Sequence, residues 1–158
     1  MKKVFSTLLI AGTVFSASAG LMDWYNGVKL DVPLPEHDLQ FVGTAPDTAG
    51  QLVLMDFWAT WCGPCRKSFP KLNTWHAKYA SKGLVVIGVS PEGLAVVTPF
   101  VNRAQLNYPI AVEGKKSIEK AFGITALPYA FFVKAGKIVW RGQPADIDDA
   151  LIESLLAG

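Results

Sequence analysis

Two cysteines three positions apart, Cys62 and Cys65, are the only thiols in this chain of 158 residues. They lie in the segment 61–65, Trp-Cys-Gly-Pro-Cys, between an apolar run at 52–58 and a helix-like pattern. At a helix start, unpaired backbone N–H groups and the positive end of the dipole favour a thiolate over a thiol. Such a dithiol can attack a disulfide and then resolve the mixed disulfide internally. The pattern therefore predicts thiol–disulfide redox chemistry.

Two other interpretations of the cysteine pair are open from the residues alone. The first is half of a zinc site, which would need His37 and His76 or carboxylates to complete it, since no second ligand pair has suitable spacing. The second is an inert structural disulfide, although closing a loop of two residues gains little stability. We expect neither a metal ion nor another cofactor.

The N-terminus has the pattern of an export signal. Lys2 and Lys3 precede an apolar stretch that ends in small residues at 17–19, the order of segments in a secretory signal peptide. We therefore expect a signal peptide at 1–19 and one domain at 20–158; the alternative is an uncleaved membrane anchor. Without 1–19 the chain carries 13 basic and 13 acidic residues. Because no run of like charge marks a nucleic-acid surface, we expect no nucleic-acid partner.

The hydrophobic pattern beyond residue 20 predicts alternating strands and helices that form a mixed sheet with helices on both faces. Leu52–Trp58 is expected as a central strand, and Ser90 and Asp146 as helix N-caps. After a lead-in at 20–51 with one or two short strands, the expected strands are 52–58, 84–89, 108–112 at the sheet edge, 129–133 and 137–141. The expected helices are 62–80, with Pro70 as a kink, 91–106, 117–122 and a last one after Asp146.

Residues 52–70 resemble the thioredoxin superfamily, on the cysteine motif, the preceding Asp-Phe-Trp-Ala and the following Pro70. The segment 57–66, Phe-Trp-Ala-Thr-Trp-Cys-Gly-Pro-Cys-Arg, is most similar to the exported TlpA/ResA-like branch. The resemblance covers roughly residues 28–157. It implies an α/β thioredoxin fold: a mixed central sheet flanked by helices, with a helix–strand–helix insert, within Ser90–Leu127, before a cis-proline strand.

The resemblance also implies roles for individual residues. Cys62, at an exposed helix start, is the expected attacking thiolate, and Cys65 the less exposed resolving thiol of a redox-active disulfide. Pro128 is expected in the cis form, leaving the preceding backbone free to pair with substrate. Leu127 and Trp61 are expected to border the substrate; the alternative for Trp61 is plain core packing.

Asp56 is the one charged residue in the apolar run 52–58. Burying a carboxylate is costly, so the functional interpretation is an acid of raised pKa that takes and returns the proton of Cys65. The alternative is a carboxylate near the strand end that reaches water or an unrelated donor. Arg66 is interpreted either as an aid to the thiolate or as an exposed cation. His76 is expected on the helix surface without a role.

Three positions depart from the TlpA-like pattern. Ser68 stands where many members carry Glu, and Asp56 where the branch usually has a neutral residue. The Tyr-Ala pair at 129–130 lacks the acidic residue of members that act in cytochrome c maturation. These differences leave the dithiol chemistry unchanged.

The sequence thus predicts an enzyme, a periplasmic thiol–disulfide oxidoreductase acting as a monomer on exported proteins with disulfides, such as an apocytochrome c. The Gly-Pro pair at 63–64 is the dipeptide of reducing thioredoxins and favours a reductant. Such a reductant needs a membrane electron donor. The alternatives are a non-enzymatic chaperone or peptide-binding module and a thiol peroxidase.

Overall fold

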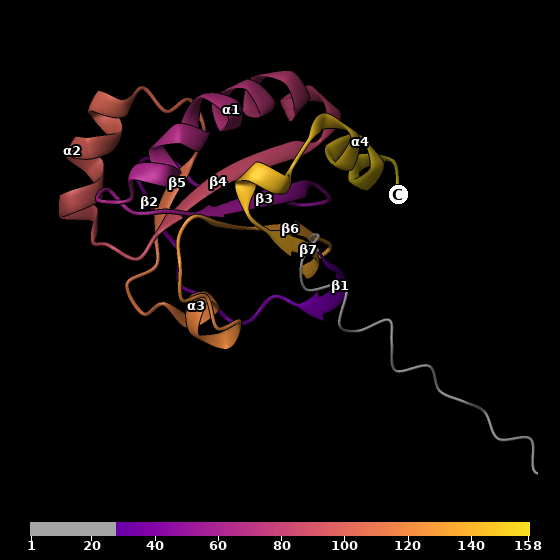
Figure 1. Ribbon diagram of the computed structural model, residues 1–158, viewed down its shortest axis with the longest axis horizontal. Coiled ribbons are helices and arrows are strands. Elements are labelled where there is room, and N and C mark those ends of the chain that lie inside the picture. The colour runs from indigo at the N-terminus through magenta and orange to yellow at the C-terminus, as the bar shows by residue number, and fades with distance from the viewer. Residues whose placement is uncertain (1–27) are drawn as a thin grey trace, which may run out of the picture.

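A seven-stranded mixed sheet with helices on both faces organises the computed structural model, which describes residues 28–158 (Figure 1). The predicted signal peptide at 1–19 and residues 20–27 of the predicted domain lie outside the described residues. The strands are β1 (Val28–Pro33), β2 (Gln40–Phe41), β3 (Leu52–Phe57), β4 (Leu84–Ser90), β5 (Ile110–Val112), β6 (Tyr129–Lys134) and β7 (Lys137–Gly142). The helices are α1 (Gly63–Tyr79), α2 (Leu94–Ala104), α3 (Ser117–Ala121) and α4 (Asp149–Ala157), with short 3-10 helices η1 (Ala80–Lys82) and η2 (Pro144–Asp146).

The strands follow the order β1-β7-β6-β3-β4-β5-β2 across the sheet. β3 lies at the centre, parallel to β4 and antiparallel to β6, and all of its residues are buried. This matches the continuous apolar run and confirms the prediction of a central strand covered on both faces. The elements α2, β5 and α3 follow one another between β4 and β6, which is the predicted helix–strand–helix insert.

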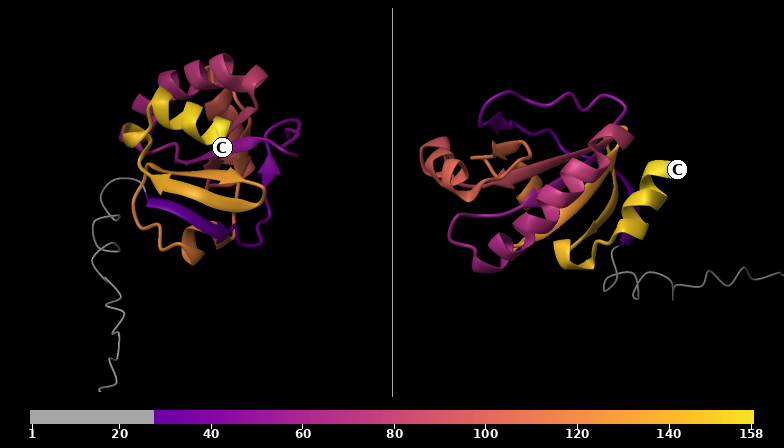
Figure 2. Two further views of the ribbon diagram at one scale, coloured as in Figure 1. Left: turned by 90° about the vertical axis from the view of Figure 1, so that its right-hand side faces the viewer. Right: turned by 90° about the horizontal axis from the view of Figure 1, so that it is seen from above.

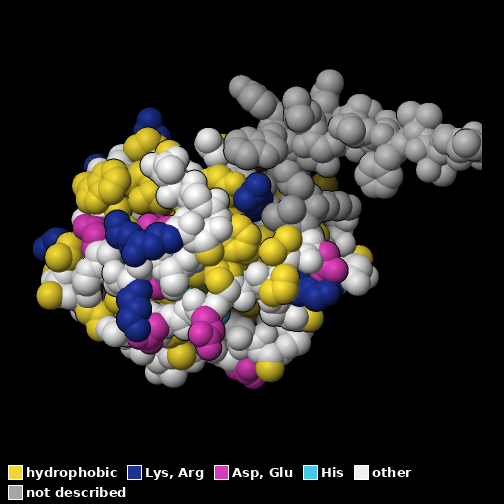
Figure 3. Space-filling model, turned by 90° about the horizontal axis from the view of Figure 1, so that it is seen from below, with side chains coloured by type: hydrophobic (Ala, Val, Ile, Leu, Met, Phe, Trp, Pro, Cys, Tyr) yellow, Lys and Arg dark blue, Asp and Glu magenta, His cyan; other side chains and the backbone are white. Residues whose placement is uncertain are grey.

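Two hydrophobic cores lie on opposite faces of the sheet. One contains side chains of α1, α2 and α4, and the other contains a side chain of α3. Figure 2 shows α1 and α4 together over the first face. On the side of α3, charged side chains of both signs are interspersed with hydrophobic ones (Figure 3). No helix within residues 28–158 is long and apolar enough to cross a lipid bilayer.

Helix α1 carries the cysteine motif at its first turn. Its buried stripe, Phe69, Leu72, Trp75 and Tyr79, has the spacing of one helix face and packs on the sheet, as predicted. Gly83, with φ at +95°, adopts the left-handed conformation that follows η1 and precedes β4. Packing of this apolar stripe on the sheet therefore fixes the orientation of α1, whose first turn follows the carboxyl end of β3.

Three local predictions are wrong. β5 is not an edge strand, because the two-residue strand β2 pairs antiparallel with it on the outside. Ser90 does not cap α2, because it is the last residue of β4; Gly93 is the N-cap instead. Asp146 does not cap α4, because it belongs to η2, and Asp148 accepts a hydrogen bond from the Leu151 N–H at 2.8 Å.

Candidate active site

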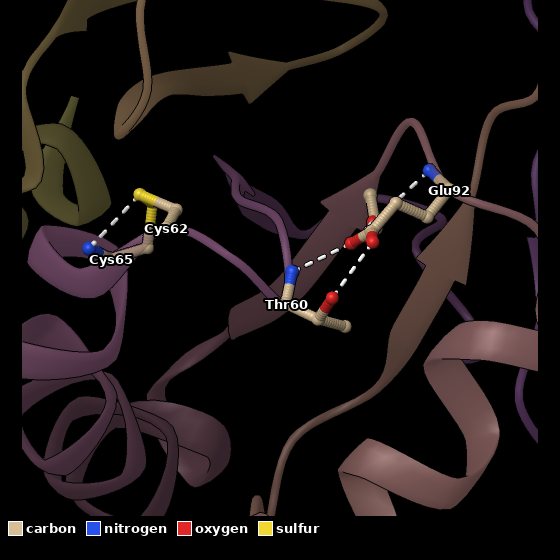
Figure 4. The surroundings of a disulfide bond; sticks show 5 residues. Thr60, Cys62, Cys65 and Glu92 are labelled. Carbon is tan, nitrogen blue, oxygen red and sulfur yellow. Dashed lines mark hydrogen bonds between the residues drawn. A yellow bond between two sulfur atoms is a disulfide. The ribbon is translucent and has the colours of Figure 1, made fainter.

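The two cysteines form a disulfide across the first turn of α1, with their Cα atoms 5.3 Å apart. Cys62 is the N-cap residue of the helix, and its Sγ atom accepts a hydrogen bond from the Cys65 N–H at 3.2 Å (Figure 4). Most N-caps use an oxygen for this purpose. The sulfur of Cys62 therefore lies where a free backbone donor and the positive end of the helix dipole favour negative charge.

The residues of the motif differ sharply in exposure. Cys65 is fully buried and Cys62 is 3% exposed, whereas Trp61 is 71% exposed. The prediction that Cys65 is less exposed than Cys62 is confirmed. The expectation that Cys62 lies at an exposed position is wrong, because only a small part of its side chain reaches the surface. Core packing of Trp61 is excluded. Arg66 is exposed on α1, in line with the interpretation as a surface cation.

Asp56 lies at the centre of the sheet and is completely buried. Its neighbours in register, Gly88 on β4 and Ala130 on β6, carry no polar side chain. Neither carboxyl oxygen has a hydrogen-bond partner within residues 28–158. Burial raises the pKa of Asp56 to about 7. The alternative of a carboxylate that reaches the surface or a donor at the strand end is wrong, and the predicted burial of Asp56 is confirmed. Its exchange of a proton with Cys65 stays a prediction.

Asp56 is on the face of β3 that α1 covers. Side chains along a strand alternate between faces, so Asp56 shares its face with Leu54 and Trp58. Both belong to the core that also contains Cys62 and Cys65. The carboxyl group and the disulfide are therefore on the same side of the sheet, as proton exchange between them would require.

The peptide bond between Leu127 and Pro128 is cis, which confirms the prediction. The next residue, Tyr129, starts β6 and pairs with Phe57 at the end of β3. The proline thus lies at the edge of the sheet from which the cysteine loop departs. Leu127 is half-buried, and residues 125–127 take part in none of the loop hydrogen bonds between backbone groups of the described chain.

The sequence reasoning missed Glu92, which ties the cysteine loop to the end of β4. The carboxylate of Glu92 accepts hydrogen bonds from the N–H of Thr60 at 2.6 Å and from its hydroxyl at 2.7 Å (Figure 4). The buried Ser90 hydroxyl also donates to Glu92, at 3.3 Å. Since the carboxyl ends of parallel neighbours meet at one edge, an acid just after β4 is placed to meet the loop after β3.

The zinc alternative does not fit this arrangement. Within residues 28–158 no group of three or more His, Cys, Asp or Glu side chains is placed to hold a metal ion. His37 lies in the lead-in loop, where its Nδ1 is 2.9 Å from the carbonyl oxygen of Pro35. The histidines that the zinc alternative requires are therefore not gathered around the cysteine pair.

The fold and the helix-capping disulfide are those of a thioredoxin-like protein. A solved structure of a putative thiol:disulfide interchange protein DsbE from Chlorobium tepidum superposes with a TM-score of 0.69 and 30% identity, covering 80% of this chain and 95% of that chain. StoA from Bacillus subtilis superposes with a TM-score of 0.53 and 26% identity, covering 60% of this chain and 74% of that one. These matches confirm the predicted fold class.

The model of the AhpC/TSA family matches residues 31–141, and the chain belongs to this family. The thiol-disulfide oxidoreductase ResA of Bacillus thuringiensis subsp. konkukian is 35% identical over 111 residues, covering 69% of this chain and 64% of the relative. ResA of Geobacillus thermodenitrificans is 27% identical over 144 residues, covering 87% and 83%. The chain spans 55% of ResA from another B. thuringiensis strain, Al Hakam. The predicted resemblance to the ResA-like branch is thereby confirmed.

Proposed function

We propose that this protein is a thiol–disulfide oxidoreductase that exchanges its Cys62–Cys65 pair with disulfides of protein substrates. The observation that carries the proposal is the Cys62 sulfur at the start of α1, within hydrogen-bond distance of the Cys65 N–H. A serine hydroxyl there would also cap the helix, without redox chemistry. A sulfur that closes and reopens a disulfide also uses the charge stabilisation that the helix start offers.

In the first step, the Cys62 thiolate of the reduced protein attacks one sulfur of a substrate disulfide. The S–S bond of the substrate breaks, a mixed disulfide with Cys62 forms, and the second substrate sulfur leaves as a thiolate that takes up a proton. The Cys65 N–H and the dipole of α1 stabilise the attacking thiolate, as the hydrogen bond to the Cys62 sulfur indicates.

In the second step, Cys65 attacks the Cys62 sulfur and displaces the first substrate sulfur. The enzyme becomes oxidised by two electrons and the substrate becomes a dithiol. Cys65 is fully buried, so its thiol needs a nearby base before it can attack. Asp56 is that base, because a carboxyl group with a pKa of about 7 can both accept and release a proton near neutral pH.

The substrate is an extended segment of a protein chain. The exposed Trp61 and the half-buried Leu127 lie on the loops that flank the disulfide. Backbone groups before the cis-proline are placed to pair with such a segment, since loop hydrogen bonds of the protein do not occupy them. In this proposal Pro128 fixes the direction in which those groups face.

The cellular setting of the proposal follows from the sequence pattern. The signal-like pattern at 1–19 supports export to the periplasm, where the substrates are exported proteins with disulfides, apocytochrome c among them. The Gly-Pro pair supports a reductant, with a reduction potential of about −270 mV rather than the value of about −120 mV found for a strong oxidant. A membrane donor then restores the dithiol, and the protein acts as a monomer.

Reduction of insulin disulfides tests the proposed chemistry. The wild-type protein, supplied with a dithiol reductant, is expected to accelerate insulin reduction, and Cys62→Ser to remove that acceleration. Cys65→Ser is the matched control: it keeps the attacking sulfur and is expected to accumulate a mixed disulfide with insulin. Equal behaviour of wild type and Cys62→Ser would favour a non-enzymatic binding module, and rapid peroxide consumption by Cys62 a thiol peroxidase.

The direction of electron flow needs a separate measurement. Equilibration of the Cys62–Cys65 couple with glutathione gives its reduction potential. A reductant is expected near about −270 mV, and a value at or above about −150 mV would reverse the proposed direction while leaving the exchange chemistry in place.

A further inference from the structure

Helix α1 carries cationic side chains and no acidic one along its whole length. The exposed cations are Arg66, Lys67, Lys71 and Lys78, and residues 63–79 contain no Asp or Glu. Beyond position 19 the chain has 13 basic and 13 acidic residues. The excess of positive charge therefore belongs to this helix and not to the chain as a whole.

Two of these cations are held by the region of α4. Lys71 Nζ donates to a backbone carbonyl just before α4 at 2.7 Å, and Lys78 Nζ pairs with the carboxylate of Asp149 at 2.6 Å. Neither Arg66 nor Lys67 forms an ion pair in the described part of the chain. Their charges are therefore free to act on a molecule that approaches this surface.

Arg66 and Lys67 lie about one helical turn from the start of α1, where Cys62 is the N-cap. The Arg66 N–H donates to the Cys62 carbonyl oxygen at 3.3 Å, so the two residues follow each other along one face of the helix. Lys67 stands in the same relation to Gly63. The segment 122–129, which contains the cis-proline, has no charged residue.

The acid that is tied to the cysteine loop does not neutralise these two cations. The Glu92 carboxylate accepts hydrogen bonds from the N–H and the hydroxyl of Thr60 and from the hydroxyl of Ser90. Figure 4 shows Thr60 between the disulfide and Glu92. The charge that α1 presents beside Cys62 is therefore positive.

The two cations act against the stability of the helix that carries them. Positive charge near the start of a helix is unfavourable, because the helix dipole is positive there. Like charges four positions apart, here Lys67 and Lys71, repel each other. Helix α4 has the usual arrangement, with Asp148 as N-cap and Asp149 in the first turn. Positions that break a local rule without a structural gain are expected at functional sites.

We propose that Arg66 and Lys67 form a cationic patch that selects substrate disulfides flanked by acidic residues. This inference rests on the proposed function, since it concerns which disulfides reach Cys62. When a substrate sulfur meets Cys62, the residues beside the substrate cysteine are within roughly 10 Å of the patch. The Debye length is about 10 Å at an ionic strength of about 0.1 M, so a carboxylate at that distance is still attracted.

Stabilisation of the Cys62 thiolate is the competing role for these cations. That role would speed the attack on every disulfide by the same factor, whatever the charge of the substrate. Attraction of acidic substrates instead changes the ratio of the rate constants for acidic and basic substrates. The charge of the substrate therefore separates the two roles, whereas the overall rate does not.

Three disulfide-linked peptide dimers, identical except for Glu, Gln or Lys on either side of the cysteine, test the selection. The rate constant for oxidation of the reduced protein by each dimer is measured. The Glu-to-Lys ratio of the wild type is then divided by that of Lys67→Glu, so that the intrinsic reactivity of each dimer cancels. We expect a quotient of at least about five at an ionic strength of about 0.01 M. It should approach one at about 1 M, where the Debye length is about 3 Å.

Lys120→Glu is the matched control, because Lys120 is an exposed lysine on α3, which packs on the other face of the sheet. It changes the net charge by the same amount and should keep the wild-type ratio. Arg66→Glu should shift the ratio in the same direction as Lys67→Glu. A shift in Lys120→Glu as large as that in Lys67→Glu would show that net charge makes the selection, and would contradict the proposed patch.

Unfolding in urea tests whether the cations oppose stability. Lys67→Glu should unfold at the same or a higher urea concentration than the wild type, because a carboxylate at that position suits the helix dipole and pairs with Lys71 four positions later. Unfolding at a clearly lower concentration would mean that the Lys67 cation stabilises α1, so that its position has a structural cause and the proposal fails.

The kinetic results also distinguish failure of this proposal from failure of the proposed function. If no dimer oxidises the reduced protein, the oxidoreductase function is overturned, and the selection by charge with it. If all three dimers react but the ratio is the same in wild type, Lys67→Glu and Arg66→Glu, the function stands and the selection does not. If all three rates fall by one factor in Lys67→Glu, the cation acts on the thiolate, and the selection is again excluded.

Discussion

Two carboxyl groups are buried in the described part of the chain, and their surroundings differ completely. Glu113 is 1% exposed and Asp56 is fully buried. Glu113 accepts hydrogen bonds from the N–H and the hydroxyl of Ser117 and from the N–H of Ile118, at the start of α3. Asp56 accepts none from residues 28–158. Burial alone therefore does not distinguish a structural acid from a functional one; the presence or absence of donors does.

The largest expected effect is on the pH dependence of stability, through Asp56→Asn. Burial raises the pKa of Asp56 from 3.8 to about 7. The folded protein thus holds this proton more tightly than the unfolded chain, so the free energy of unfolding falls as pH rises from about 4 to about 7 and then levels off. Asp56→Asn should remove a fall on the order of 4 kcal/mol. Urea unfolding between pH 4 and pH 8 measures it.

The exposed Asp47, whose carboxylate accepts a hydrogen bond from the Ala49 N–H, provides the control for this prediction. Asp47→Asn should retain the wild-type fall in stability with pH. If Asp56→Asn also retains it, Asp56 is ionised in the folded protein without cost, and the contrast with Glu113 disappears.

Replacing Glu113 is expected to lower stability at neutral pH, whereas replacing Asp56 removes a loss of stability there. Glu113→Ala leaves the Ser117 and Ile118 donors at the start of α3 unpaired, and we expect the free energy of unfolding to fall by about 2–3 kcal/mol. Thermal and urea unfolding at pH 7 give the value. A Glu113→Ala variant as stable as the wild type would show that water replaces the carboxylate freely, so that its donors do not explain its burial.

An intermediate case is Glu92, a partly buried acid with donors that come from a distant loop. Glu92→Gln replaces one acceptor oxygen by a donor group and should lower stability by about 1–2 kcal/mol. The amide hydrogen of Thr60, now without its partner, should exchange with solvent faster than in the wild type. Glu36→Gln, at an exposed position, is the control. Unchanged exchange at Thr60 would mean that the loop is held by other contacts.

The smallest effect is expected at an exposed acid, Asp148, the N-cap of α4. Asp148→Ala removes the acceptor of the Leu151 N–H and should cost about 1 kcal/mol. Asp146→Ala should cost less, because its longer hydrogen bond of 3.3 Å joins only η2. Urea unfolding of both variants ranks them. The reverse ranking would favour the cap position that the sequence pattern alone suggested.

The elements with strong periodicity could be predicted from the sequence. The apolar run of β3 and the stripe on α1 gave both their type and their bounds to within a residue or two, and the buried state of Asp56 followed from its apolar neighbours. The position of β5 inside the sheet could not be predicted, because its outer neighbour β2 has two residues and no pattern. Asp146, the predicted cap of α4, and Asp148, the cap that the structure shows, are separated by a single residue, which the pattern could not resolve.

Contacts across the sheet were beyond the sequence reasoning. Thr60 and Glu92 are 32 positions apart, and nothing in either segment marks the other. The grouping of Trp58 and Tyr108 beside Gly88 depends on strand register, which a single sequence does not give. The near burial of Cys62 was missed for the same reason, since the spacing of a motif does not reveal which neighbours cover it.

The two outer strands have a consequence for self-association. An edge strand with free N–H and C=O groups is a template on which another chain can add. Here β2 has only two residues, and β1 has an irregular register between Lys29 and Val32 and ends at Pro33, which lacks an N–H. Neither edge presents a long, regular row of free groups. The protein is proposed to bind extended segments of other chains, and its short and irregular edge strands disfavour aggregation with those chains.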